Sequence, residues 1–180
     1  MQLRSASPAW VKRVIWNFKH GHKEIGPAPS DILSILDDRL ARKASVLDMG
    51  CGRGNLLRAL RSRQWMGDYT GVDISSNAID VGRSLGDQGA EWIVASLEQF
   101  TPMKTYDCIL LLESIYYVRR DYVSSIIGRL RRSLSPNGVG YVRICDKVVH
   151  SVYLSLLLDL GQRVEWDAGP VVITSFTHAW

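Results

Sequence analysis

The sequence predicts an α/β protein with a doubly wound sheet of seven strands, mostly parallel, that ends in an antiparallel hairpin. Strand-like apolar runs alternate with helical patterns along most of the 180 residues, which is typical of a parallel sheet covered by helices on both faces. Near the C-terminus, two strand-like runs at 163–167 and 171–178 have Gly169-Pro170 in the short connection between them. Such a connection favours antiparallel pairing, because parallel strands need a long crossover.

Residues 1–29 are predicted to form a helical segment outside the sheet domain, which is assigned residues 30–180. Ser7-Pro8 is typical of a helix start, and Gly21 of a helix end. Three large apolar residues share one face of this helix at helical spacing: Trp10, Val14 and Phe18. A helix with such a face is expected to bury it.

Each element in the first half of the sheet domain has its own signal. A helix over 31–41 follows the capping residue Ser30 and repeats apolar residues at helical spacing. Two short apolar runs, each carrying an acidic residue at or near its end, predict strands at 45–49 and 69–74. Two helices and a third strand are expected at 54–63, 76–85 and 91–97.

The second half is expected to contain a strand, a helix, a strand and a helix at 107–112, 122–134, 139–145 and 148–160. The first of these strands is apolar almost throughout, which predicts a central position with both faces buried. The first helix carries an apolar stripe, and its arginines are expected to face solvent: Arg129, Arg131 and Arg132. Ser135-Pro136-Asn137-Gly138 predicts a turn before the second strand.

The stretch from Val46 to Leu57 carries the strongest functional signal. Asp48, near the end of an apolar run, is followed by glycine at every second position: Gly50, Gly52 and Gly54. Glycines permit positive φ and let a ligand approach the backbone, and the N–H groups of the following helix face a polar or anionic ligand. The dinucleotide pattern G-x-G-x-x-G would need a glycine at position 55, where this chain has Asn55.

The spacing D-x-G-x-G-x-G resembles motif I of the class I S-adenosylmethionine-dependent methyltransferases. A second acid, Asp73, ends the next strand 21 residues after Gly52, where the resemblance implies that its carboxylate accepts both hydroxyl groups of a ribose. The alternatives are a glycine-rich turn of another α/β protein and an acid that only caps the next helix. The resemblance covers the chain from about residue 30 onward and implies S-adenosylmethionine as the cofactor.

The resemblance also implies which residues bind this cofactor. Its methionine part is expected at the glycine loop, its ribose at Asp73, and its adenine at Ser96 and Leu97. Ser96 stands where the family often has an acid, so its hydrogen bond to an amine should be weaker than that of a charged acceptor. The full expected set is Asp48, Gly50, Cys51, Gly52, Gly54, Asn55, Asp73, Ile74, Ser96, Leu97 and Leu112.

Glu113, Tyr117 and His150 are the candidate catalytic residues, because they follow strand ends. Methyl transfer from a sulfonium mainly requires alignment of donor and acceptor, and a base is needed only if the acceptor enters protonated. Packing or a local hydrogen bond is the alternative role for each, and His20 and His22 are further candidates from the N-terminal segment. The chain lacks the [DN]-P-P-[YFW] signature after residue 112, which disfavours methylation of nucleobase amino groups or glutamine.

Composition places few other constraints on function. The N-terminus lacks a secretory signal and apolar residues make up 46% of the chain, so a cytoplasmic protein is expected. The apolar run 152–160 contains Asp159 and is too short to span a membrane. The three cysteines form no C-x-x-C pair and the histidines lack a strong ligand spacing, so no metal site is expected.

We therefore expect an S-adenosylmethionine-dependent methyltransferase that acts on oxygen or nitrogen of a small molecule. Residues 1–63 carry 12 Lys and Arg against 5 Asp and Glu, which favours an RNA or protein methyltransferase as the alternative. No basic run is interleaved with aromatic residues, however, and this disfavours a nucleic-acid partner. A cofactor-binding subunit that does no chemistry is a third alternative. The sequence does not specify an oligomeric state.

The N-terminal helix is expected to act as a lid. The surface that the predicted fold leaves uncovered is the cleft at the strand ends, where the apolar face of that helix could be buried. We therefore expect Ser7–His22 to close over cofactor and acceptor, with Gly21 and Gly26 as hinges.

Overall fold

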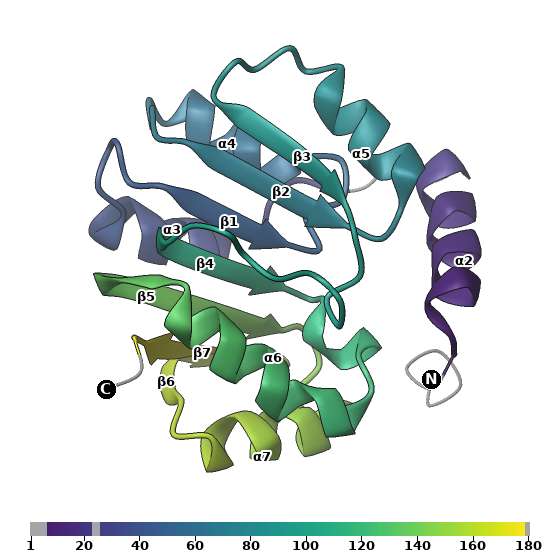
Figure 1. Cartoon of the computed structure of the whole chain (residues 1–180). Coiled ribbons are helices and arrows are strands. Elements are labelled where there is room, and N and C mark those ends of the chain that lie inside the picture. Colours follow the sequence, from purple (N-terminus) through teal and green to yellow (C-terminus); the bar gives the residue numbers. More distant parts are fainter. Residues whose placement is uncertain (1–6, 23–25, 179–180) are drawn as a thin grey trace.

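The computed structural model describes residues 7–22 and 26–178, apart from the side chains of residues 20–22. Its strands are β1 Val46–Met49, β2 Tyr69–Asp73, β3 Ala90–Val94, β4 Tyr106–Leu112, β5 Leu134–Ile144, β6 Arg163–Ala168 and β7 Val171–Thr177. They form one seven-stranded sheet in the order β3-β2-β1-β4-β5-β7-β6 (Figure 1). Strands β1 to β5 pair in parallel, and β7 pairs antiparallel with β5 and β6. The predicted fold class is confirmed.

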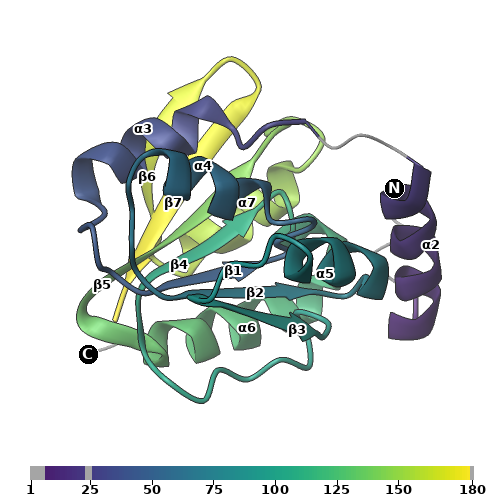
Figure 2. The same ribbon diagram turned by 90° about the horizontal axis from the view of Figure 1, so that it is seen from above.

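Helices cover both faces of this sheet. They are α2 Ala9–His22, α3 Ser30–Arg39, α4 Asn55–Ser62, α5 Ser76–Arg83, α6 Arg120–Arg132 and α7 Ser151–Asp159, with a short 3-10 helix, η1, at Ile115–Tyr117. Helices α3, α4 and α5 lie on one face, and α6 and α7 lie on the other (Figures 1 and 2). Helix α2 stands beside α5, at the end of the sheet to which the parallel strands point (Figure 1). Within the described ranges, no helix is long and apolar enough to cross a membrane.

Alternation along the central strands builds a hydrophobic core on each face of the sheet. On β4, Ile109 and Leu111 join the cluster that contains α6 and α7, whereas Cys108 and Leu110 join the cluster that contains α3, α4 and α5. Successive side chains of a strand point to opposite faces, so a strand buried on both faces needs apolar residues at every position. This is why residues 108–112 form a continuous apolar run.

The structure corrects the prediction for the connection between α6 and β5. The helix ends before Leu134, which already belongs to the strand. The predicted turn at 135–138 is instead a bulge within β5, because Tyr106 pairs with Leu134 while Cys108 pairs with Val139. Proline and glycine are compatible with bulges as well as with turns, so their presence could not distinguish the two.

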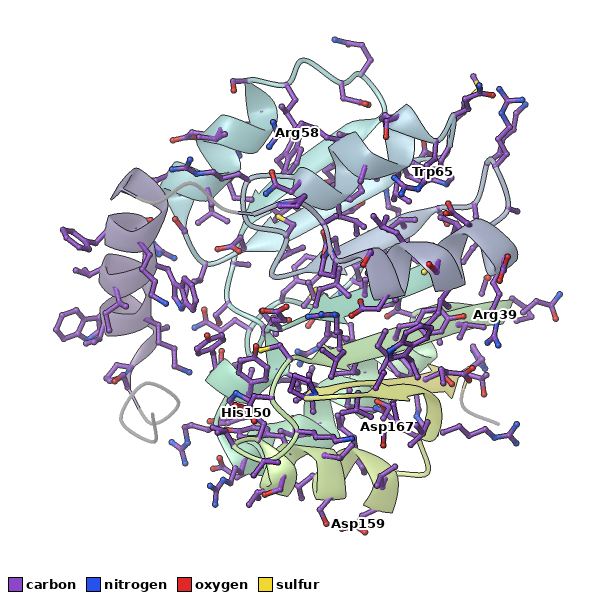
Figure 3. All side chains as sticks on the ribbon, turned by 180° about the vertical axis from the view of Figure 1, so that it is seen from behind. Arg39, Arg58, Trp65, His150, Asp159 and Asp167 are labelled. Carbon is purple, nitrogen blue, oxygen red and sulfur yellow. The ribbon has the colours of Figure 1, made fainter. Side chains whose placement is uncertain are left out.

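The prediction that α2 buries its apolar stripe is wrong. Trp10, Val14 and Phe18 are 70%, 62% and 68% exposed. Large side chains of α2 project away from the sheet, to the outside of the molecule (Figure 3). The helix packs through its other face, where Lys12 is 6% exposed. A helical period identifies an apolar stripe but does not say which neighbour covers it.

Candidate active site

A cavity of about 520 Å³ lies at the carboxyl ends of the parallel strands, next to α2. Open α/β sheets bind ligands at this end, where the strand order reverses. Every residue predicted to bind the cofactor lines the cavity except Gly54, and the candidate catalytic residues Glu113 and Tyr117 line it too. His150 is not part of the lining. The topology thus brings residues from the ends of β1, β2, β3 and β4 to one site.

The glycine loop between β1 and α4 has a backbone that favours glycine at three positions. Gly50, Gly52 and Gly54 have φ values of +92°, +53° and +78°. A Cβ on Gly50 would lie 2.5 Å from the Cβ of Ser114. A Cβ on Gly54 would lie 2.4 Å from the ring of Trp92, behind the loop. Gly54 therefore shapes the loop without lining the cavity.

Asp73, at the end of β2, is held by two backbone donors. The Gly52 N–H donates to its Oδ2 at 3.0 Å, and the Ser75 N–H donates to its Oδ1 at 2.8 Å. The carboxylate therefore ties the glycine loop to the turn before α5. A carboxylate has about four acceptor sites, so these two bonds leave it able to accept hydroxyl groups of a ligand.

Asp48 is a buried carboxyl group beside the glycine loop. The Tyr69 hydroxyl donates to its Oδ2 at 2.7 Å, whereas Oδ1 has no hydrogen-bond partner among the described residues. Burial raises the pKa of Asp48 to about 7; the Tyr69 hydrogen bond opposes this rise and the charge of Asp73 adds to it. Burial likewise raises the pKa of the Cys51 thiol, which stays protonated. Asp48 can thus exchange a proton near neutral pH.

Arg53 brings a cation to the wall of the cavity. Its Nε is buried and has no hydrogen-bond partner within the described part of the chain. A guanidinium remains charged in proteins, and a buried donor without an acceptor is costly. Gly26, which also lines the cavity, is tied to α4 by Asn55, whose Nδ2 donates to the Gly26 carbonyl oxygen at 2.7 Å. A ligand with an anionic group would supply the acceptor that Arg53 lacks.

The loop after β3 is anchored from two sides. The Arg129 guanidinium of α6 donates to the Leu97 carbonyl oxygen at 2.7 Å. Arg129 therefore helps to shape the site, contrary to the prediction that it faces solvent. On the other side, Lys12 Nζ lies 2.6 Å from Glu98 Oε1, and both side chains are largely buried. This ion pair joins α2 to the loop that carries Ser96 and Leu97.

Glu113 is held in a left-handed backbone conformation, with φ of +59°, beside an ion cluster. Its carboxylate pairs with Arg143 of β5. Arg143 is buried and also donates two hydrogen bonds of 2.8 Å to the carboxylate of Asp31 in α3. The cluster links β4, β5 and α3 and orients Glu113 at the cavity wall. Sequence reasoning missed Arg143, because a lone arginine in a strand does not reveal its partners.

Trp16 of α2 and Tyr117 of η1 form an aromatic wall of the cavity. Their ring centroids are 4.8 Å apart and the rings meet edge to face. Lys19 Nζ lies 4.3 Å from the Trp16 ring centroid and lines the same side. Three lining residues of α2 recur at helical spacing: Lys12, Trp16 and Lys19. This spacing is the sequence signal for the inward face of α2. The more apolar stripe on the opposite face led instead to the prediction that the opposite face is buried.

His150 lies outside the cavity wall. It occupies the N-cap position of α7 rather than lying inside a helix that starts at residue 148 (Figure 3). Its ring stacks on Tyr116 with 3.7 Å between centroids, and burial lowers its pKa. The side chains of His20 and His22 fall outside the described part of the chain.

The cavity fits the cofactor that the sequence resemblance implies. The amino-acid end of S-adenosylmethionine carries an ammonium and a carboxylate. Among the residues that the structure describes, the wall offers an acceptor without a donor, Asp48 Oδ1, and a donor without an acceptor, Arg53 Nε. Asp73 adds a carboxylate for ribose hydroxyl groups. In the described residues, no group of three or more His, Cys, Asp or Glu is placed to hold a metal ion.

Comparison with known proteins identifies relatives over most of this chain. The family model of the methyltransferase domain matches residues 21–169. Trans-aconitate 2-methyltransferase of Enterobacter sp. (strain 638) is 30% identical over 138 residues, which are 74% of this chain and 52% of that protein. Trans-aconitate 2-methyltransferase of Rhizobium leguminosarum bv. trifolii (strain WSM2304) is 27% identical over 126 residues, which are 70% of this chain and 47% of that protein. The chain thus spans about half the length of these curated relatives.

Among solved structures, the magnesium protoporphyrin IX methyltransferase ChlM of Synechocystis PCC 6803, with bound S-adenosylmethionine, superimposes with a TM-score of 0.70. The match covers 97% of this chain and 99% of that one, at 15% sequence identity. At this identity the similarity shows a shared fold.

Proposed function

Because the chain belongs to the S-adenosylmethionine-dependent methyltransferase family, as the match over residues 21–169 shows, we propose that it methylates a carboxylate oxygen of a small organic acid. Two curated relatives, the trans-aconitate 2-methyltransferases, support an acid as the acceptor class. The cationic side chain of Lys19 on the cavity wall also favours an anionic acceptor.

Residues at the ends of the parallel strands would each hold a different part of the cofactor. Asp73 would accept the ribose hydroxyl groups, and Ser96 and Leu97 would flank the adenine. Asp48 and Arg53 would meet the ammonium and the carboxylate of the methionine part. When bound, S-adenosylmethionine supplies a methyl group on a sulfonium centre, which needs no further activation.

The contacts of Glu113 favour a carboxylate as the methyl acceptor, because they leave no evident base at the cavity wall among the candidate catalytic residues. Its carboxylate is already paired with Arg143, and His150 lies behind Tyr116, away from the cavity lining. A carboxylic acid is ionised at neutral pH, so methylation of its oxygen requires no base. Tyr117 would then orient the acceptor, while Glu113, held by Arg143, would shape the cavity wall.

The proposal includes α2 as a lid over cofactor and acceptor. The helix contacts the segments that follow three of the parallel strands, β2, β3 and β4. These contacts are Asn17 with Ser75 after β2, Lys12 with Glu98 after β3, and Trp16 with Tyr117 after β4. A helix that bridges three strand ends can close the cavity and exclude water from the transfer.

Deletion of residues 1–22 should therefore leave a folded domain that binds the cofactor more weakly and transfers methyl groups poorly. The sheet and both hydrophobic clusters lie outside the deleted segment, so cooperative thermal unfolding should persist. Calorimetry measures cofactor affinity and a labelled-methyl assay measures turnover. Normal turnover by the shortened chain would show that α2 is not a lid, and loss of folding would show that it is part of the core.

The acceptor class is tested by transfer from S-adenosylmethionine with an isotopically labelled methyl group. Mono-, di- and tricarboxylic acids should yield methyl esters, which release the label as methanol in mild base. Phenols, amines, unmodified RNA and a peptide mixture are tested in parallel. Labelling of RNA, with affinity that falls steeply with salt, would replace the proposal with an RNA methyltransferase. Cofactor binding without transfer to any class would indicate a non-catalytic subunit.

Cofactor affinity should depend on the protonation of Asp48. Its pKa of about 7 means that the carboxyl group is mostly neutral at pH 6 and mostly ionised at pH 7.5. Since only the ionised form attracts the cofactor ammonium, calorimetry should show binding about five- to tenfold weaker at pH 6 than at pH 7.5. Asp48→Asn should abolish this pH dependence. Tyr69→Phe should shift its midpoint upward, because the Tyr69 hydrogen bond lowers this pKa.

A further inference from the structure

Asn17 of α2 reaches the turn that carries Asp73. Its Oδ1 accepts a hydrogen bond from the Ser75 hydroxyl at 2.8 Å, and its Nδ2 donates to Ser76 Oγ at 3.3 Å. Its backbone carbonyl accepts a hydrogen bond from Asn77 Nδ2 at 3.2 Å. These bonds join α2 to the first turn of α5, a segment about 60 residues away in the sequence.

Ser75 connects this contact to the cofactor site. It is fully buried and is the N-cap residue of α5, where its hydroxyl oxygen accepts from the Ala78 N–H at 3.2 Å. The same hydroxyl donates its one proton to Asn17, while the Ser75 backbone N–H holds Asp73 Oδ1 at 2.8 Å. Asn17 therefore reaches the carboxylate of Asp73 through a single intervening residue.

We propose that Asn17 is a positioning residue that couples closure of α2 to recognition of the cofactor ribose by Asp73. The inference rests on the proposed function, in which α2 is a lid over an S-adenosylmethionine site. With α2 docked, the buried Ser75 hydroxyl has both its donor and its acceptor bonds, and the turn from Asp73 to Ser76 has one arrangement. Without Asn17, that hydroxyl loses its acceptor and reorients toward other neighbours, which loosens the turn that aims Asp73.

The coupling must work in both directions. If docking of α2 improves the geometry of Asp73 for two neighbouring hydroxyl groups, then binding of those hydroxyl groups favours docking of α2 by the same factor. The lid would thereby close on a complete cofactor in preference to one that lacks the ribose hydroxyl groups.

The test compares two ligands that cannot donate a methyl group: S-adenosylhomocysteine and its analogue without the 2′ and 3′ hydroxyl groups. Calorimetry on the full-length chain should show that the natural protein prefers the hydroxylated ligand by about tenfold or more, since hydrogen bonds to a charged acceptor are lost in the analogue. Asn17→Ala should reduce this preference to within about threefold. If Asn17 only pins the helix in place, both ligands will weaken equally and the preference will not change, which would overturn the proposal.

Matched variants separate positioning from general loosening of the lid. Ser76→Ala removes the partner of Asn17 Nδ2 but leaves the bond between Asn17 Oδ1 and the Ser75 hydroxyl, so this variant should keep the preference. Ser75→Ala should lower the preference, and adding Asn17→Ala should lower it no further, because the two residues act in series. A further decrease in the double variant would contradict this path.

A volume-matched variant and a folding check complete this experiment. Asn17→Leu keeps the side-chain volume and should reproduce Asn17→Ala, and thermal unfolding verifies that each variant is folded. Because no acceptor is present, a failure to methylate acids would not affect this test. If neither ligand binds the natural chain, the cofactor assignment fails and the role of Asn17 fails with it.

Discussion

Gly52→Val should abolish cofactor binding and leave the sheet folded. Gly52 has φ of +53°, a left-handed conformation that is very unfavourable for a β-branched residue. Its N–H also donates to Asp73 Oδ2, so a shift of the loop would disturb the ribose acceptor as well. Calorimetry with S-adenosylmethionine should detect no binding at concentrations that saturate the natural chain, while circular dichroism retains the α/β spectrum.

Gly86→Val is the matched control for this experiment. Gly86 also has a left-handed backbone, with φ of +69°, but it lies in the connection between α5 and β3 and is not part of the cavity lining. A Cβ there meets no atom within 4 Å, so the substitution imposes the same kind of backbone strain without changing the site. Normal binding by Gly52→Val at normal stability would show that the glycine loop does not hold the cofactor.

Asp73→Ala should weaken cofactor binding by about 1–3 kcal/mol, a factor of about 5 to 150. The ribose hydroxyl groups lose a charged acceptor, and the N–H groups of Gly52 and Ser75 lose the bonds that tie the glycine loop to α5. Isothermal titration calorimetry at fixed pH measures the change. Asp73→Asn, which retains one acceptor oxygen, should lose less affinity than Asp73→Ala.

Asp87→Ala controls for the loss of a carboxylate elsewhere in the same half of the sheet. Asp87 pairs with Arg61 at 2.7 Å and does not line the cavity. Its removal should lower thermal stability without changing cofactor affinity. Unchanged affinity in a folded Asp73→Ala protein would remove Asp73 from the site.

The fold could be predicted because its signals are local. Strands buried on both faces need apolar residues at successive positions, and the connections between them carry glycine and proline where the backbone turns. The exception at 135–138 has a physical reason: Pro136 and Gly138 suit a bulge as well as a turn, and only the pairing of β4 with β5 decides between them. The exposed apolar stripe of Trp10, Val14 and Phe18 on α2 is a similar case, because whether a helix face is buried depends on which other element packs against it.

Much of the candidate site could be predicted for a topological reason. In a parallel sheet, residues that end successive strands meet at one edge, so Asp48, Asp73 and Leu112 could be grouped without knowledge of any contact. Contacts between distant segments could not be grouped in this way. The sequence separations of Asn17 from Ser75 and of Arg143 from Asp31 are 58 and 112 residues, and polar residues of these types are common on protein surfaces.

The central place of β1 in the sheet affects the order in which the protein can be completed during synthesis. One edge of β1 pairs with β2, but the other pairs with β4, which starts at Tyr106. A nascent chain that has not yet reached that residue exposes the unpaired backbone N–H and C=O groups along one edge of β1, and such edges readily pair with other chains. The arrangement that surrounds the glycine loop with buried strands thus leaves an edge open to aggregation until β4 has been synthesised.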